Sequence, residues 1–167
     1  DVVVGYNGDL YVVGGIGGNI FRYNSAGTYQ NKIKVATGTM RMFGCGMDPT
    51  DSTDKYIYCA DWAYGWIAKI CTGRVLDSDC SKAGLVKKKK YVSSPLDMAV
   101  HSSGDWLISA DCNGVRRYNL PNLTTTNIKA NTGCPDFVSF DDSGNWYVTI
   151  WWQHNTQKWS GTNSFSK

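Results

Sequence analysis

"GDLYVVGGIGGNIFRYN", residues 8–24, alternates apolar and polar residues on both sides of a cluster of glycines. Such alternation is typical of a half-buried β-strand, and glycine supplies the positive φ that a tight turn needs. A phosphate-binding loop would have to open a helix. The continuation NIFRYNSAGTYQNKI instead alternates and contains more Gly, Asn and Thr than a helix tolerates. The stretch therefore predicts a strand, a turn and a second strand.

The first strand of this unit recurs three more times, as six-residue copies that begin at Leu10, Tyr56, Trp106 and Trp146. Gly and then Asp or Asn precede three of the copies, and in the second copy this turn is lengthened to MDPTDSTDK, residues 47–55. A short apolar strand comes before each turn. The strand after each copy ends in a basic and then an apolar residue: Arg22-Tyr23, Lys69-Ile70, Arg117-Tyr118 and Lys158-Trp159. With one further strand, each unit is a four-stranded antiparallel sheet.

The copies begin 46, 50 and 40 residues apart. Repeats of this length, each with four strands, indicate a β-propeller. We expect one all-β domain over residues 1–167, with repeats at approximately 1–39, 40–92, 93–132 and 133–167. The composition agrees, because 13% of the residues are aromatic, 18 are glycine and only 19% are charged. No apolar stretch is long enough to span a bilayer. The chain begins without Met inside an apolar pattern, which predicts a processed chain or a piece of a longer one.

The detail of the repeat resembles the NHL-repeat family of propellers. The stretches that carry the resemblance are FDDSGNWYVTIW (140–151), VHSSGDWLISADCNGVRRYNL (100–120) and YIYCADWAYGWIAKI (56–70). An Ala-Asp pair typical of that family is present at 60–61 and 110–111 but is replaced by Gly14-Gly15 and Ile150-Trp151 in the other copies.

The number of blades departs from that family, whose propellers usually have six blades. An open arc of four blades leaves two sheet faces that need cover. Three arrangements remain open: a closed four-bladed ring, a ring completed by other copies of the chain, or part of a larger propeller.

Six cysteines, with no C-x-x-C pair, predict disulfides and therefore a secreted or extracellular protein. Cys45 and Cys59 lie at equal distances from a turn near Ser52, as a cross-strand pair would. Cys71 and Cys80 flank the next turn, which leaves Cys112 with Cys134. Fifteen pairings are possible, so this assignment is a geometric hypothesis. Asn122-Leu123-Thr124 is a candidate N-glycosylation site.

The resemblance places the turns after the second strand of each blade together at one end of the propeller. Large aromatic residues are unusual in turns, and together they would form a stacking surface for sugar rings or an anchor for a protein partner. We expect ligand contacts from Trp62, Tyr64, Trp66, Trp151 and Trp152, with His154 nearby and with Asp61 and Asp111 as polar anchors. Packing between blades is the competing role for the aromatic residues, and backbone hydrogen bonding is the competing role for the two aspartates.

Other charged groups carry weaker signals. The formal net charge is +3, and without Lys87–Lys90 it is 3 − 4 = −1, so the chain is not a general nucleic-acid binder. The lysine run would steer acidic ligands or protect a strand edge. Asp48, Asp51 and Asp54 do not have the spacing of an EF-hand loop and are expected in a solvated turn. His101 is likewise expected in a solvated turn.

The sequence favours a secreted, non-catalytic recognition module that binds a glycan or an extracellular protein, with no cofactor, no metal and no catalytic residues. The alternative is a self-assembling structural subunit of an extracellular matrix, filament or coat. A propeller lyase or hydrolase is the least favoured reading, because such chemistry draws on histidines and the chain has only 2.

Overall fold

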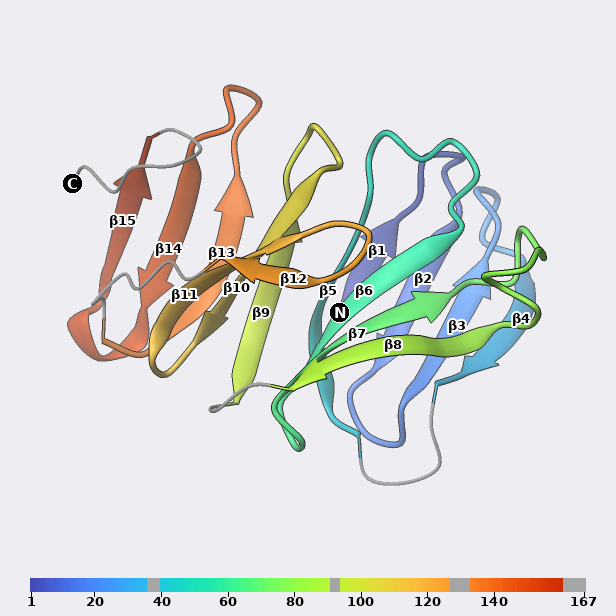
Figure 1. The fold of residues 1–167 in the computed structure, drawn as a ribbon, viewed down its shortest axis with the longest axis horizontal. Helices are drawn as coiled ribbons and strands as arrows, with labels where there is room; N and C mark the ends of the chain where they lie inside the picture. Colours follow the sequence, from blue (N-terminus) through green and yellow to red (C-terminus); the bar gives the residue numbers. More distant parts are fainter. Residues whose placement is uncertain (36–39, 91–93, 127–132, 161–167) are drawn as a thin grey trace.

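The computed structural model describes residues 1–35, 40–90, 94–126 and 133–160. Its strands form four separate antiparallel sheets, and one three-residue 3-10 helix is present in the described part. Figure 1 shows the sheets side by side in chain order, with the first sheet at one end of the row and the fourth at the other. This arrangement confirms the predicted all-β chain of propeller-type blades.

The strands have the following bounds. The first sheet contains β1 (Val2–Val4), β2 (Leu10–Gly14), β3 (Asn19–Tyr23) and β4 (Tyr29–Lys34). The second contains β5 (Met42–Met47), β6 (Tyr56–Asp61), β7 (Trp66–Cys71) and β8 (Gly84–Lys90). The third contains β9 (Pro95–Val100), β10 (Trp106–Asp111), β11 (Gly114–Asn119) and β12 (Thr124–Thr126). The fourth contains β13 (Pro135–Phe140), β14 (Trp146–Ile150) and β15 (Asn155–Trp159), with the 3-10 helix η1 (Trp151–Gln153) between its last two strands.

Glycine makes the turn between the first two strands of three sheets possible. Gly8, Gly104 and Gly144 have φ of 78°, 74° and 75°, a left-handed conformation that other residues rarely adopt. These are the glycines of the repeated Gly-Asp and Gly-Asn pairs. The predicted strand–turn–strand units are therefore confirmed at the positions where the sequence repeats.

The second, third and fourth sheets each pack against the sheet that precedes them in the chain. Strand β5 contacts β1 and β2, β9 contacts β5 and β6, and β13 contacts β9 and β10. An apolar core fills each of these three interfaces. We call the face of a sheet that is directed toward the preceding sheet its preceding-side face, and the face directed toward the next sheet its following-side face. The same names are used for the corresponding faces of the first and fourth sheets.

The turn before the second strand differs in length between sheets, and this changes which face a side chain occupies. Aligned on their Gly-Asp or Gly-Asn turns, Trp106 and Trp146 are equivalent in sequence. Strand pairing shows otherwise, because Trp146 pairs with Phe140 at the end of β13, whereas Leu107 is the residue that pairs with Val100 at the end of β9. One additional residue in a turn moves every side chain of the next strand to the opposite face.

As a result, the two tryptophans face each other. Trp106 lies on the following-side face of the third sheet and Trp146 on the preceding-side face of the fourth, and both belong to the core between these sheets. The sequence alignment of the repeats is therefore off by one residue at the third sheet. The second sheet shows the same shift, since Ile57 pairs with Met47 at the end of β5.

All three predicted disulfides are present. Cys45 and Cys59 are direct partners across β5 and β6, with their Cα atoms 4.1 Å apart. Cys71 at the end of β7 is joined to Cys80 in the turn before β8, and Cys112 after β10 is joined to Cys134 before β13. The second sheet therefore holds two covalent links, and the third link connects the third sheet to the segment that enters the fourth.

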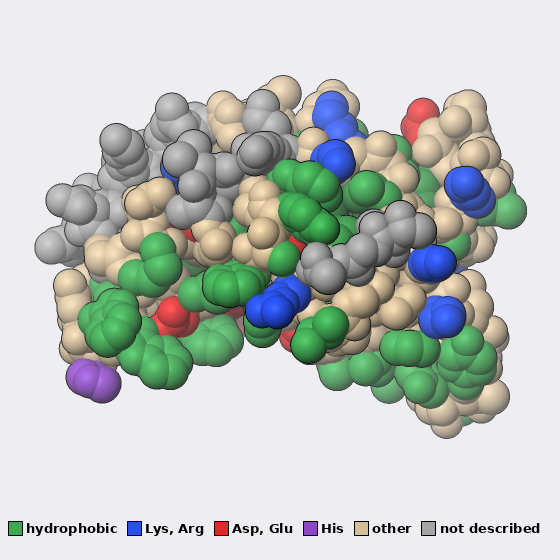
Figure 2. Space-filling view, turned by 90° about the horizontal axis from the view of Figure 1, so that it is seen from below, with side chains coloured by type: hydrophobic (Ala, Val, Ile, Leu, Met, Phe, Trp, Pro, Cys, Tyr) green, Lys and Arg blue, Asp and Glu red, His purple; other side chains and the backbone are tan. Residues whose placement is uncertain are grey.

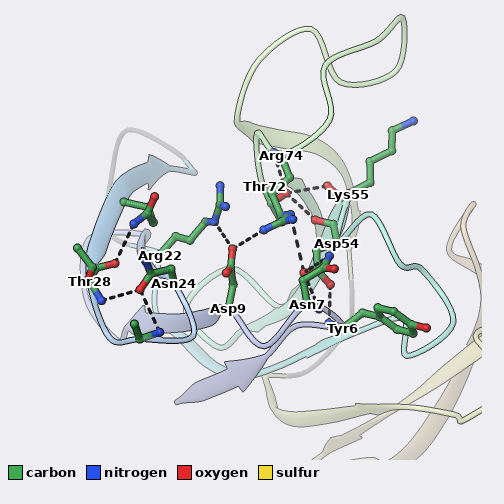
Figure 3. A network of polar contacts seen from close by, with 12 residues as sticks. Tyr6, Asn7, Asp9, Arg22, Asn24, Thr28, Asp54, Lys55, Thr72 and Arg74 are labelled. Atoms are coloured by element: carbon green, nitrogen blue, oxygen red, sulfur yellow. Dashed lines mark hydrogen bonds and ion pairs between the residues drawn. The ribbon is translucent and has the colours of Figure 1, made fainter.

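A buried carboxylate ties the first sheet to the second, and the sequence did not reveal this role. Asp54 is fully buried, and its oxygens accept hydrogen bonds from the backbone N–H of Tyr6 at 2.6 Å and of Asn7 at 3.4 Å. Arg74 of the second sheet lies between Asp54 and Asp9, and Arg22 binds Asp9 from the other side (Figure 3). Asp54 is thus not in a solvated turn as expected.

Among the residues that the structure describes, no helix is long and apolar enough to cross a membrane.

Replacement of Asp54 by Ala is expected to lower the free energy of unfolding by about 2 to 4 kcal/mol. The substitution leaves the backbone N–H groups of Tyr6 and Asn7 without their acceptor and removes one of the two carboxylates beside Arg74, which costs more than the loss of an exposed hydrogen bond. Urea unfolding followed by tryptophan fluorescence measures the change. Asp142→Ala, at an exposed turn position of the fourth sheet, is the control. Equal effects of the two substitutions would show that Asp54 does not hold the two sheets together.

Candidate functional site

The turns that join the second and third strands lie along one side of the row of sheets, the lower side in Figure 1. Figure 2 looks at this side and shows hydrophobic side chains exposed across it, with acidic and basic side chains between them. The aromatic residues on this side of the molecule fall into separate groups.

The first group surrounds a hollow of about 500 Å³ between the first strands of the sheets, which we call the inner strands (β1, β5, β9 and β13). Phe43 of β5, Phe137 of β13 and Trp151 of η1 supply aromatic walls. The three are among the most exposed large side chains, at 47%, 64% and 64% exposure. Acidic residues and one leucine complete the lining: Asp1, Asp97, Asp136 and Leu96.

A second hollow of about 460 Å³ adjoins the first and shares Asp136, Phe137 and Trp151 with it. His154 lines this second hollow together with residues of β14 and β15. His154 has φ of 47° and donates its backbone N–H to the carbonyl of Trp151, which ends the 3-10 helix. This short helix is what holds Trp151 over both hollows.

Trp62 lies next to the first hollow through Phe43. The two rings are 6.4 Å apart in an edge-to-face arrangement, and the Arg41 guanidinium lies 5.4 Å from the centre of the Trp62 ring. Trp62 is 39% exposed, so one side of its ring remains open to solvent. It extends the aromatic surface around Phe43.

Tyr64 and Trp66 form a separate group on the second sheet. Their rings stack at 4.8 Å, and the Lys88 ammonium lies 3.6 Å from the centre of the Trp66 ring. Lys88 belongs to β8, the outer strand of the sheet, so the lysine run does lie on a sheet edge. Neither ring lines the two hollows described above. The structure thus divides the five predicted aromatic residues, and Trp152, 76% exposed, also lies outside both linings.

Asp61 and Asp111 are fully buried and do not face the hollows. Asp61 accepts hydrogen bonds from the backbone N–H of Arg41 at 3.0 Å and of Ala63 at 3.1 Å. Asp111 accepts a hydrogen bond from the Asn113 N–H at 2.6 Å and lies 3.6 Å from Arg116. Backbone hydrogen bonding, the competing role for these residues, is what the geometry shows, although the bonds lie within a sheet and not between sheets.

Asp97 and Asp136 are two of the three acidic residues that line the first hollow. Burial raises the pKa of the Asp97 carboxyl, although hydrogen bonds from the N–H groups of Val138 and Met98 oppose this effect. Burial also raises the pKa of Asp136, and a hydrogen bond from the Trp151 N–H opposes it. The Asp97 carboxyl is therefore a poorly solvated acceptor beside the hollow, whereas Asp136 is only partly buried.

Sequence reasoning missed Phe43, Phe137, Asp97 and Asp136, because it searched the turns and these residues lie on the inner strands. A repeated position could have indicated Asp97 and Phe137. Counted back from the last residue of each inner strand, Asp1, Gly44, Asp97 and Phe137 occupy equivalent positions. Asp1 and Asp97 reach the next sheet, where they accept hydrogen bonds from the N–H groups of Cys45 at 2.8 Å and Val138 at 2.9 Å.

His101 is half-buried, which differs from the expected solvated turn. Its ring stacks on Trp106 at 4.4 Å and meets Phe140 edge to face at 5.1 Å. Burial lowers the pKa of its imidazole, with a smaller contribution from Arg117. Over the described ranges, no group of three or more His, Cys, Asp or Glu side chains is placed to hold a metal ion. Asn122 is exposed in the turn between β11 and β12.

No family model matches the chain, and no curated protein matches it in sequence. The specific resemblance to NHL repeats therefore stays a prediction. Among solved structures, 579 chains match, so the fold is widely shared and does not by itself indicate an activity. One of them, Kuenenia stuttgartiensis hydrazine synthase, matches with a TM-score of 0.71 at 11% identity over 88% of this chain. The match covers 40% of that chain, so the present chain spans less than half of its length.

The raised pKa of Asp97 predicts a pH-dependent stability difference between the wild type and Asp97→Asn. Because the folded state holds the proton more tightly than the unfolded chain, the wild type loses stability as pH rises from the ordinary value of 3.8 through the raised one. The asparagine variant lacks this titration and should gain relative to the wild type over that range.

Urea unfolding of both proteins at acidic and neutral pH measures the difference. Asp142→Asn reports the effect of removing an exposed carboxylate in the same background. A stability difference for Asp97→Asn that is the same at both pH values would mean that the Asp97 charge is well solvated in the folded protein.

Proposed function

We propose that this chain is a non-catalytic recognition module that binds a neutral glycan in the hollow lined by Phe43, Phe137 and Trp151. The observation that carries the proposal is the combination of three exposed aromatic side chains with carboxylates in one concave site. Exposed aromatic rings cost free energy in water unless they have a partner to cover them.

The two kinds of side chain match the two kinds of surface on a sugar. The apolar C–H face of a pyranose ring stacks on aromatic rings, and its hydroxyl groups donate hydrogen bonds to carboxylates. Asp97 and Asp136 supply such acceptors at the edge of the hollow. Since Asp97 is held in a poorly solvated setting, a hydrogen bond to it is stronger than one made in water.

The charge of the lining favours a neutral ligand over an acidic one. Among the described residues that line the larger hollow, the charged side chains are Asp1, Asp97 and Asp136, and none is a lysine or arginine. An acidic glycan would therefore meet like charge there. The Lys88 side chain lies with Tyr64 and Trp66, outside this lining.

The disulfides support a secreted setting for this function. Three disulfides link all six cysteines, and such bonds persist in oxidising compartments. Glycans are abundant on the surfaces that a secreted protein meets, and the exposed turn at Asn122 is accessible for glycosylation of the chain itself.

Replacement of Trp151 by Ala is expected to weaken binding of a neutral oligosaccharide, selected on a glycan array, at least tenfold. Loss of one stacking ring removes roughly 1.5 to 3 kcal/mol of apolar burial. Isothermal titration calorimetry measures the affinity. Trp152→Ala is the matched control, because it removes a neighbouring tryptophan that lines neither hollow.

Equal losses for the two tryptophan variants would contradict binding in this hollow. A different result is that no glycan on the array binds but an extracellular protein does, and that Trp151→Ala abolishes binding of this protein. The site would then stand, and its ligand would be a protein.

A further inference from the structure

Two sheet faces lie at the ends of the row, and the rest of the structure indicates what covers them. The first sheet has no sheet before it in the described chain, and the fourth has none after it. Within the described residues, no other sheet covers the preceding-side face of the first sheet or the following-side face of the fourth, and we call these the two open faces. These are the two kinds of face that pack together at each of the three internal interfaces.

The open face of the first sheet is mostly apolar. Strand pairing places seven apolar residues on it: Val2, Val4, Leu10, Val12, Phe21, Tyr23 and Tyr29. It also places Asn19 there, and Lys32 and Lys34 on the outer strand β4. Val2, Val4 and Tyr29 are more than half exposed, at 56%, 63% and 53%. The preceding-side face of the fourth sheet has the same character, with Val138, Trp146 and Val148, and there the third sheet covers it. A surface of this composition is typical of an interface and not of a solvated sheet.

The repeated pair of a basic and an apolar residue on the third strand of each sheet shows how the faces are built. In the three sheets that have a predecessor, the apolar member is buried on the preceding-side face, as Ile70, Tyr118 and Trp159. Tyr23 is the corresponding residue of the first sheet. It lies on the open face, where its ring contacts Tyr29 at 5.7 Å.

The basic member lies on the following-side face. Lys69 is positioned over Tyr56 at 3.7 Å, Arg117 over Trp106 at 4.4 Å and Lys158 near Tyr147 at 5.4 Å. Lys69 is only 8% exposed and lies on the face of the second sheet that meets the third, whereas the side chain of Lys158 is 55% exposed. The open face of the fourth sheet thus carries the feature that a following sheet covers elsewhere in the chain.

We infer that a second copy of this chain docks on the first sheet with its own fourth sheet, so that copies associate head to tail. The occupant is a second copy because the chain itself carries both halves of the interface that it forms three times internally. The contact is heterologous, since two different faces meet, and it leads to a closed ring or to a filament according to the angle between successive copies.

The experiment uses two variants that each block one open face. Val12→Arg places a charge in the middle of the open face of the first sheet. Ser139→Arg does the same on the open face of the fourth sheet, at an exposed residue of β13 that pairs with Tyr147 and lines neither hollow. Sedimentation equilibrium of the unreduced protein measures the mass. Ile16→Glu, at an exposed turn residue outside both faces, is the control.

Head-to-tail docking makes a specific prediction for the mixture. The wild type and the control should sediment as multiples of 18.5 kDa, and each arginine variant alone as the 18.5 kDa monomer. Mixed in equal amounts, the two variants should form a dimer of twice that mass and nothing larger. Each pair retains one intact interface, between the first sheet of Ser139→Arg and the fourth sheet of Val12→Arg.

Two results would overturn the inference. One is a wild type that stays at 18.5 kDa up to its solubility limit. The other is loss of association in Val12→Arg with full association in Ser139→Arg, which would indicate a symmetric contact between two first sheets. Circular dichroism and urea unfolding verify that both variants fold. Glycan binding by Ser139→Arg is measured in parallel, so that failure of the docking inference remains separate from failure of the proposed glycan site.

Discussion

The two-residue period of the β-strand is the constraint on which this structure depends. Because successive side chains point to opposite faces, every sheet has two faces that need a partner or water. The burial of the second strand of each sheet depends on the position of that sheet in the row. Strands β6 and β10 are buried at almost every residue, whereas β2 and β14 alternate between buried and half-buried residues. Strands between two sheets lose the alternation that strands of the end sheets keep.

Much of the fold could be predicted from the sequence because its signals are local. The Gly-Asp turns, the alternation around them and the spacing of the cysteines each act within one sheet or between neighbouring segments. The face that Trp106 or Trp146 occupies could not be read in this way, because it depends on a single residue in the turn before the strand. The role of Asp54 was hidden for another reason, since its partners Tyr6 and Asn7 lie 48 and 47 residues away in the chain.

The candidate site could be predicted only in part. Trp62 and Trp151 stand out in sequence as large aromatic residues in turns. Phe43 and Phe137 do not, because an aromatic residue on a strand is ordinary, and only the packing of the inner strands brings them to the same hollow as Trp151. Tyr64 and Trp66 satisfy the same sequence criterion as Trp62, but they stack on each other beside Lys88 in a separate cluster on the second sheet.

The uneven placement of the disulfides has a consequence for the response of the chain to mechanical force. No cross-link lies before Cys45 or after Cys134, so a pull on the two ends of the chain can extend the first and the fourth sheet at about 3.3 to 3.6 Å per residue. Between these cysteines, the loops closed by sequence separations of 14, 9 and 22 residues cannot lengthen. The two outer sheets are therefore expected to extend fully under load, whereas the middle of the chain extends by less than its residue count implies.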